Sequence, residues 1–211
     1  MYTVEIKNAR YLYGFAQLSQ YRPLEMPEIA IAGKSNVGKS SFINMLTNIN
    51  GLAKVGQTPG KTRMINVFLL NGSFTLMDLP GYGYAKVARS EQERFSRLIE
   101  GYLHASQRLK HVFLLLDVRH APTQDDLMMI NWLSFYHVPF SVIATKADKL
   151  SKAQLSRRRQ ELSRETGLIV SEIFPVSSVT RQGKETVCER LAQLLAHENG
   201  VAEQNELIEQ F

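Results

Sequence analysis

The feature that most constrains the fold of this chain is a glycine-rich segment near its start. Residues 33–40 read Gly-Lys-Ser-Asn-Val-Gly-Lys-Ser and fit the phosphate-binding pattern G-x-x-x-x-G-K-[ST] at every position. The apolar run from Glu28 to Ala32 before it is typical of a buried strand, and Phe42, Ile43 and Leu46 after it have helical spacing. A strand, a glycine loop and a helix in this order let backbone N–H groups surround phosphate oxygens at the helix N-terminus. We therefore predict a nucleotide phosphate site rather than an ordinary glycine turn.

The last two residues of this loop have predicted chemical roles. The amine of Lys39 would reach the β and γ phosphates, and the hydroxyl of Ser40 would be a ligand of Mg²⁺. The residues predicted to bind the phosphates are Gly33, Lys34, Ser35, Asn36, Val37, Gly38, Lys39 and Ser40.

Strand-like and helix-like segments alternate along most of the chain, which predicts an α/β fold. Two strand-like runs flank Asn71-Gly72, the dipeptide that most strongly favours a hairpin. The continuous apolar run 112–116 is typical of a central parallel strand buried on both faces. A helix over 123–136 would turn Leu127, Ile130 and Leu133 inward. We predict a P-loop NTPase fold with a mostly parallel six-stranded sheet, one antiparallel edge strand and helices on both faces, so that ligands bind at the carboxyl ends of the strands.

The chain divides by composition into three parts. Residues 1–22 are rich in aromatic side chains, so we expect an N-terminal extension that packs on the body as an extended segment or an extra edge strand. Residues 23–197 form the nucleotide-binding domain, with a closing helix over 183–196. Residues 198–211 carry four glutamates and no lysine or arginine, which predicts a disordered acidic tail.

Bulk properties limit the class of protein. No apolar run approaches the ~20 residues of a membrane-spanning helix, and the first residues do not resemble a secretory signal. A single cysteine excludes an internal disulfide, so we expect a cytoplasmic monomer without a membrane partner. The net charge of +5 and the pI near 9.3 are compatible with an RNA partner, but solubility explains them equally well.

Two further segments could respond to the terminal phosphate. Asp78, at the end of a predicted strand, can hold Mg²⁺ through water, and the N–H of Gly81 can contact a γ-phosphate. Thr62 is a candidate second hydroxyl ligand of Mg²⁺, with Thr58 as its competitor, although this loop alone would read as a surface turn. The predicted contacts from these segments are Gly60, Lys61, Thr62, Arg63, Met64, Asp78, Leu79, Pro80 and Gly81.

The segment Thr145-Lys-Ala-Asp predicts guanine as the base. Guanine presents two neighbouring N–H donors that the carboxylate of Asp148 can accept together, whereas adenine would leave it unpaired. The stem of Lys146 would lie along the purine face, and backbone N–H groups after the last strand could meet the guanine oxygen. The predicted base contacts are Thr145, Lys146, Ala147, Asp148, Val176, Ser177 and Ser178.

These motifs together resemble the EngB-type ribosome biogenesis GTPases, also called septum-formation GTPases. The resemblance rests on the segments 33–40, 58–62, 78–84, 117–120 and 145–148, and it covers nearly the whole chain apart from the tail. It implies that residues 23–197 are a small-GTPase G domain with Mg²⁺-dependent binding and hydrolysis of GTP. It also implies a role in assembling the large ribosomal subunit, through rRNA or ribosomal proteins, and in normal division septation.

Hydrolysis should be slow, because Tyr82 follows Gly81 where Ras-like enzymes place a glutamine that orients water. Related GTPases with an asparagine at the position of Asn36 use it to hold K⁺ beside the phosphates. Asn36 could equally just stabilise the loop turn, and ribosomal particles are another possible source of stimulation. The residues predicted to act in catalysis are Asn36, Lys39, Thr62 and Gly81.

The sequence is also weighed against two alternative functions. A nucleotide kinase would need a lid with arginines and would not need Asp148, while a GTPase module of a membrane or RNA-modification system is a further alternative. Cys188 reads as a buried structural thiol. If RNA is the partner, the basic helix 151–165 and residues 86–89 are the candidate contacts.

Overall fold

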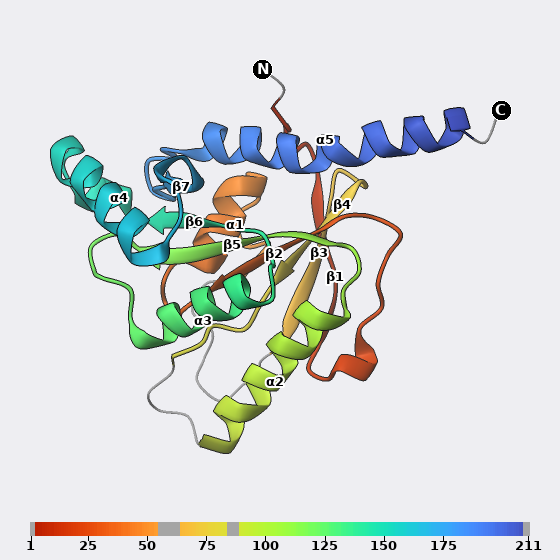
Figure 1. Cartoon of the computed structure of the whole chain (residues 1–211), viewed down its shortest axis with the longest axis horizontal. Helices are drawn as coiled ribbons and strands as arrows, with labels where there is room; N and C mark the ends of the chain where they lie inside the picture. The colour runs from red at the N-terminus through yellow and green to blue at the C-terminus, as the bar shows by residue number, and fades with distance from the viewer. Residues whose placement is uncertain (1–2, 55–63, 84–88, 209–211) are drawn as a thin grey trace.

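The computed structural model describes residues 3–54, 64–83 and 89–208. The strands within these ranges are β1 (Ala9–Phe15), β2 (Glu28–Gly33), β3 (Ile65–Leu70), β4 (Phe74–Asp78), β5 (Leu109–Asp117), β6 (Phe140–Thr145) and β7 (Ile173–Pro175). The helices are α1 (Lys39–Thr47), α2 (Arg89–Ala105), α3 (Gln124–Phe135), α4 (Lys152–Thr166) and α5 (Lys184–Ile208), with 3₁₀ turns η1 (Leu18–Gln20), η2 (Ala147–Lys149) and η3 (Val170–Glu172) (Figure 1).

The strands form one sheet in the order β1-β3-β4-β2-β5-β6-β7. Strands β4, β2, β5, β6 and β7 are parallel, whereas β3 pairs antiparallel with both β4 and β1. The α/β fold and the antiparallel edge are therefore confirmed, but the sheet has seven strands rather than the predicted six. The additional strand, β1, comes from the aromatic N-terminal segment, where an extra edge strand was one of the two expectations.

The predicted hairpin is confirmed, and its turn also fixes the N-terminal segment. Residues 71–73 connect β3 to β4, and Asn71 and Gly72 have positive φ values of 52° and 68°, the conformation that favours asparagine and glycine in hairpin turns. The side chain of Asn71 accepts hydrogen bonds from the backbone N–H groups of Lys7 and Asn8 and donates one to the carbonyl of Glu5. The turn therefore anchors the segment that leads into β1.

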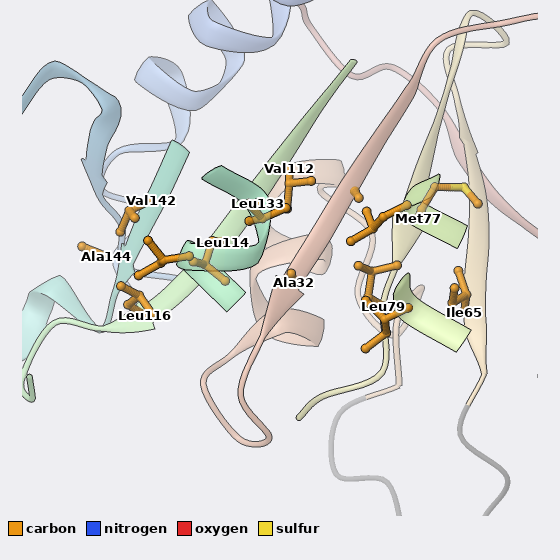
Figure 2. Packing of buried hydrophobic residues seen from close by; sticks show 14 of the residues in the cluster. Ala32, Ile65, Met77, Leu79, Val112, Leu114, Leu116, Leu133, Val142 and Ala144 are labelled. Atoms are coloured by element: carbon orange, nitrogen blue, oxygen red, sulfur yellow. The ribbon is translucent and has the colours of Figure 1, made fainter. Parts of the chain in front are cut away.

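The core consists of two apolar clusters, one on each face of the sheet. Side chains of β5 alternate between them, with Val112, Leu114 and Leu116 on one face and Phe113 and Leu115 on the other. Helices α2, α3 and α4 cover the first face, and α1 and α5 cover the second (Figure 1). Figure 2 shows the first cluster, in which side chains from neighbouring strands pack together beneath Leu133 of α3.

Two helices differ from the sequence-based expectation. In α3, Ile130 and Leu133 are buried as predicted, but Leu127 is 38% exposed, because α3 covers the sheet with a narrow stripe of its surface. Helix α5 continues to Ile208, beyond the predicted end at residue 196. Cys188 is buried on the inner face of α5, as expected. Over the described residues, we find no helix that combines the length and the apolar character needed to span a bilayer.

Candidate nucleotide-binding site

The phosphate loop joins β2 to α1, as the sequence predicted. Gly33 ends β2, and a Cβ there would lie 2.9 Å from the carbonyl oxygen of Leu115, so neighbouring β5 leaves no room for a side chain. Gly38 has open space around it but a φ of 113°, a conformation that favours glycine, and it caps the start of α1. The amine of Lys39 bends back to the carbonyl of Gly33 at 3.3 Å. The loop therefore holds Lys39 over its own backbone at the N-terminus of α1.

Asp78 lies at the end of β4, beside the strand that leads into the phosphate loop. Asp78 pairs with Ile31 of the neighbouring strand β2, and the side chain of Asp78 is buried. One carboxylate oxygen, Oδ1, has no hydrogen-bond partner among the described residues, and the other has only a 3.5 Å contact from the amide of Asn66. Burial raises the pKa of Asp78, although the charge of Lys39 opposes that shift.

This environment fits a divalent cation. Buried acceptors in proteins are nearly always satisfied, so an unpartnered carboxylate oxygen beside a phosphate loop fits a bound cation or the water of one. Ser40 lies in the first turn of α1, next to Lys39. The predicted Mg²⁺ ligand Thr62, its competitor Thr58 and the neighbouring Gly60, Lys61 and Arg63 lie outside the described residues. Met64 is described, and its sulfur packs over Gly14 of the edge strand β1.

The segment after Asp78 lies directly on the phosphate loop. The N–H of Ser35 donates to the carbonyl of Tyr82 at 3.0 Å, and Lys34 and Tyr82 form an isolated parallel bridge. A Cβ at Gly81 would lie 2.9 Å from the Lys39 amine and 3.0 Å from the Cα of Ser35. The backbone of Ser35 leaves little room for a side chain at this position, and Gly81 lies beside the amine that would hold the terminal phosphates.

Tyr82 points away from this amine, toward α3. Its hydroxyl donates to Asp126 Oδ1 at 2.8 Å, and burial, followed by the charge of Asp126, raises the pKa of the phenol. The other oxygen of Asp126 accepts from the backbone N–H and the hydroxyl of Thr123, which caps α3. Sequence reasoning missed this contact. The capping spacing from Thr123 to Asp126 was a visible signal, but nothing in it indicated Tyr82 as a partner.

The predicted base-recognition segment is brought against the phosphate loop. The hydroxyl of Thr145 donates to the carbonyls of Val37 and Leu116, at 2.9 and 3.1 Å. The amine of Lys146 lies 2.8 Å from Asp117 and 3.3 Å from the carbonyl of Asn36. Burial opposes ionisation of Asp117, but hydrogen bonds from Arg119 and Lys146 outweigh it and lower its pKa. These contacts hold the base-recognition segment at a fixed distance from the phosphate loop.

Asp148 is held by the segment after β7. Its Oδ1 accepts from the hydroxyl of Ser177 at 2.7 Å, and its Oδ2 lies 3.2 Å from the amine of Lys149. These two interactions, the Ser177 hydrogen bond first, lower the pKa of Asp148, so the carboxylate is ionised at neutral pH and can accept two N–H donors. The carbonyl of Val176 accepts from the N–H of Ala147, while Ser178 follows Ser177 in the same turn. Sequence reasoning placed Ser177 here for its backbone and missed its hydroxyl.

Asn36 lies exposed at the top of the phosphate loop with a φ of 63°. Asparagine tolerates this left-handed conformation better than most residues, which supports a role in the turn. Because the Asn36 side chain is exposed beside the phosphate loop, its amide is compatible with a role as a cation ligand as well.

The basic helix α4 uses several of its arginines within the protein. Arg158 is largely buried, pairs with Glu161 and Glu165, and donates to the carbonyl of His120. Arg159 donates to the carbonyls of Val170 and Ile173. This leaves Lys152, Arg157 and Arg164 as the candidate RNA contacts on this helix with exposed side chains, and residues 84–88 lie outside the described part.

Comparison with known proteins decides the family. Residues 28–146 match the family described as 50S ribosome-binding GTPase. A probable GTP-binding protein EngB from Desulfosudis oleivorans is 42% identical over 90% of this chain and 96% of its own length. One from Clostridium kluyveri is 48% identical over 86% and 93%. The chain belongs to the EngB family of GTP-binding proteins.

Solved structures agree on the fold. A crystal structure of a probable GTP-binding protein engB has a TM-score of 0.70 with 24% identity and covers 81% of this chain and 99% of that one. The cytosolic domain of the Thermotoga maritima FeoB iron transporter has a TM-score of 0.54 with 26% identity, covering 80% and 64%. The protein is thus a GTP-binding member of the GTPase superfamily with a G-domain fold, and the kinase alternative is set aside.

Proposed function

We propose that this protein is a cytoplasmic guanine-nucleotide switch that hydrolyses GTP slowly and binds the large ribosomal subunit or its precursors in one nucleotide state. Through that binding it would support subunit assembly and normal septation. The position of Gly81 close to the Lys39 amine carries the switch proposal. A γ-phosphate bound at the Lys39 amine would have to touch or displace Gly81, because a single added carbon there already lies 2.9 Å from that amine.

The proposed guanine site depends on Asp148. Its carboxylate is ionised and oriented by Ser177 and Lys149, so it can accept both N–H donors of guanine. An adenine nucleotide would leave this charge without partners, which costs binding free energy. Lys146, tied to Asp117, would cover the base with its stem.

The proposed Mg²⁺ ligands are Ser40 and Thr62, with Asp78 acting through water. When bound, Mg²⁺ would neutralise charge on the β and γ phosphates. The chain's own contribution is the buried Asp78 carboxylate, whose free oxygen faces no donor among the described residues. Lys39 and the loop N–H groups would bind the phosphates, and Gly81 would contact the terminal one.

Hydrolysis is proposed to be slow because Tyr82 cannot orient water at the phosphate while its hydroxyl donates to Asp126. The missing contribution would come from K⁺ held by Asn36 or from the ribosomal particle. The large subunit as partner is supported by the description of the matching family. The proposed RNA contacts on α4 are Lys152, Arg157 and Arg164, together with residues 86–89.

Competition of labelled GDP with GDP, GTP and ADP tests the nucleotide proposal. We expect GDP and GTP to displace the label at concentrations at least about 10²-fold below ADP, since adenine has no pair of N–H donors for the Asp148 carboxylate. Equal displacement by ADP would show that Asp148 does not select the base.

A further inference from the structure

A cavity of about 610 Å³ lies between α2 and α3, and Lys34 of the phosphate loop and residues 81–83 also line it. Its size is within the range of sites that hold a ligand or several side chains. The apolar side chains that line it are Phe95, Ile99, Leu103, Met128, Met129 and Trp132. The two helices that form it lie side by side over the same face of the sheet (Figure 1).

The surface beside this cavity is apolar and aromatic. Met128 is 62% exposed and Phe135 is 74% exposed, and with Trp132 they follow helical spacing along one face of α3. Tyr136 continues the stripe, and His104 of α2 stacks edge-on against it with ring centres 4.4 Å apart. Exposed aromatic and methionine side chains of this kind are enriched at protein interfaces.

The charges around the cavity favour a protein over a nucleic acid. Residues 120–145 include two aspartates and contain neither lysine nor arginine. The charged side chains that line the cavity are Glu100, Asp125 and Lys34, and Lys34 lies 3.8 Å from Asp125. Binding to RNA depends on lysine and arginine contacts to phosphates, and among the described residues that line the cavity Lys34 is the one basic side chain, already close to Asp125. A partner segment that inserts an apolar side chain and carries basic residues beside that side chain is complementary to this surface.

The cavity is also connected to the phosphate loop. Tyr82 and Gly83 form part of its wall, and the carbonyl of Tyr82 accepts the N–H of Ser35 in that loop. A Cβ at Gly83 would lie 2.6 Å from Lys34 and 2.7 Å from Asp125, so this wall is packed tightly against both residues. A side chain inserted in the cavity would touch the segment that must respond to a γ-phosphate.

We propose that the cavity and the stripe Met128–Trp132–Phe135 bind a segment of a ribosomal protein that inserts an apolar side chain and carries lysine or arginine beside it. This inference rests on the proposed ribosomal function and names the surface and the class of partner. Nucleotide state would control the binding, because Tyr82 and Gly83 directly follow Gly81 in the chain and a γ-phosphate that displaced Gly81 would shift this wall.

Site-specific photo-crosslinking tests this proposal on the full chain. The substitution Met128→p-benzoylphenylalanine places a crosslinker on the stripe, and Ile169→p-benzoylphenylalanine is the control at an apolar position of similar exposure, in the turn after α4. Each variant is irradiated with purified large ribosomal subunits and Mg²⁺, with GDP or a non-hydrolysable GTP analogue. We expect an adduct from position 128 that resists RNase and is lost with protease, several-fold stronger with the analogue, and little adduct from position 169.

The outcomes separate this inference from the function on which it rests. If the unsubstituted protein does not co-sediment with the subunits in either state, both proposals fail. If it co-sediments but position 128 gives no adduct, or gives one to rRNA, the function stands and the assignment of this surface is wrong. Met128→Glu should weaken co-sedimentation at least fivefold without changing GDP binding, whereas Ile169→Glu should have no effect; equal effects would also overturn the assignment.

Discussion

At the scale of single residues, the site depends on side chains whose partners fix both charge and direction. Asp148 is ionised because Ser177 and Lys149 stabilise its charge, and Lys146 is directed by Asp117. Asp78 is the opposite case, a buried carboxylate with an oxygen that no described residue satisfies. The first arrangement is complete without a ligand and the second is not, which is why base recognition and cation binding call for different tests.

Asp148→Asn should exchange the base preference. An asparagine side chain offers an acceptor oxygen and a donor NH₂ group, so it can accept only one of the two guanine N–H groups. Xanthine carries a carbonyl where guanine carries its amino group, and the asparagine NH₂ group can donate to that carbonyl. We expect GDP affinity to fall by about 10²-fold or more and xanthosine diphosphate affinity to rise, measured by displacement of labelled nucleotide. Lys152→Ala, at an exposed position at the start of α4 outside the nucleotide site, is the control and should change GDP affinity only slightly. Unchanged GDP binding in the asparagine variant would contradict the assignment.

Asn36→Gly separates the two roles left open for this residue. Glycine adopts the φ of 63° at least as readily as asparagine, so the turn survives while the amide is removed. If Asn36 holds K⁺, the wild type should hydrolyse GTP faster in KCl than in NaCl, and the variant should lose that difference while keeping its GDP affinity. Equal wild-type rates in the two salts would remove the K⁺ proposal and leave the turn role.

Asp78→Asn should stabilise the nucleotide-free protein at neutral pH. The pKa of Asp78 is raised in the folded state, so between its ordinary value and that raised value the folded protein binds more protons than the unfolded chain. Stability therefore falls as pH rises through this window, and the penalty is fully present above it. Asparagine removes the penalty but also the carboxylate, so Mg²⁺ should no longer strengthen GTP binding. Urea unfolding at pH 5 and pH 8 and nucleotide titration with and without Mg²⁺ measure the two effects. A variant less stable than wild type at pH 8 would refute this explanation.

At the scale of elements, the N-terminal segment is fastened to α2 through a buried carboxylate. Glu28, at the start of β2, accepts hydrogen bonds from the hydroxyls of Tyr21, Tyr102 and Ser106, at 2.7, 2.8 and 2.7 Å. Leu18 in η1 packs near Gly101 of the same helix. The C-terminal end of α2 is therefore held in place. Its N-terminal end comes soon after residues 81–83, which contact the phosphate loop, in the chain.

Tyr102→Phe tests this attachment. The substitution keeps the ring but removes a donor from a buried carboxylate, which should cost about 1–3 kcal/mol of unfolding free energy in a urea titration. Tyr11→Phe on β1 is the control, because Tyr11 is exposed, and it should change stability by less than about 0.5 kcal/mol. A loss no greater than that of the control would show that the carboxylate does not depend on Tyr102.

The elements also show what a sequence can and cannot predict. The phosphate loop, the Asn71-Gly72 hairpin and the segment 145–148 were predictable because each is continuous and its conformation follows from its own residues. The bond from Tyr82 to Asp126 joins residues 44 positions apart, and the contacts of Glu28 reach 78 positions, so no local pattern indicates them. The place of β1 at the sheet edge likewise depends on pairing with β3 rather than on its own composition.

At the scale of the whole molecule, the sheet brings the predicted ligand groups together at the carboxyl ends of its parallel strands. The phosphate loop follows β2, Asp78 ends β4, Asp117 ends β5 and Thr145 ends β6, and all four strands are parallel. Ligand sites of such sheets lie at the carboxyl ends of the strands. Residues 81–83 lie between these strand ends and the cavity between α2 and α3. A bound nucleotide and a bound partner would therefore both touch residues 81–83.

The nucleotide is proposed to control binding of the protein to the large ribosomal subunit. The most direct test of this control is sedimentation of the full chain through a gradient with purified large subunits, in GDP and in a non-hydrolysable GTP analogue, with Mg²⁺ present in both. We predict that the protein migrates with the subunits in the analogue and remains mostly at the top of the gradient in GDP. Identical behaviour in the two nucleotides, whether bound or free, would contradict the claim.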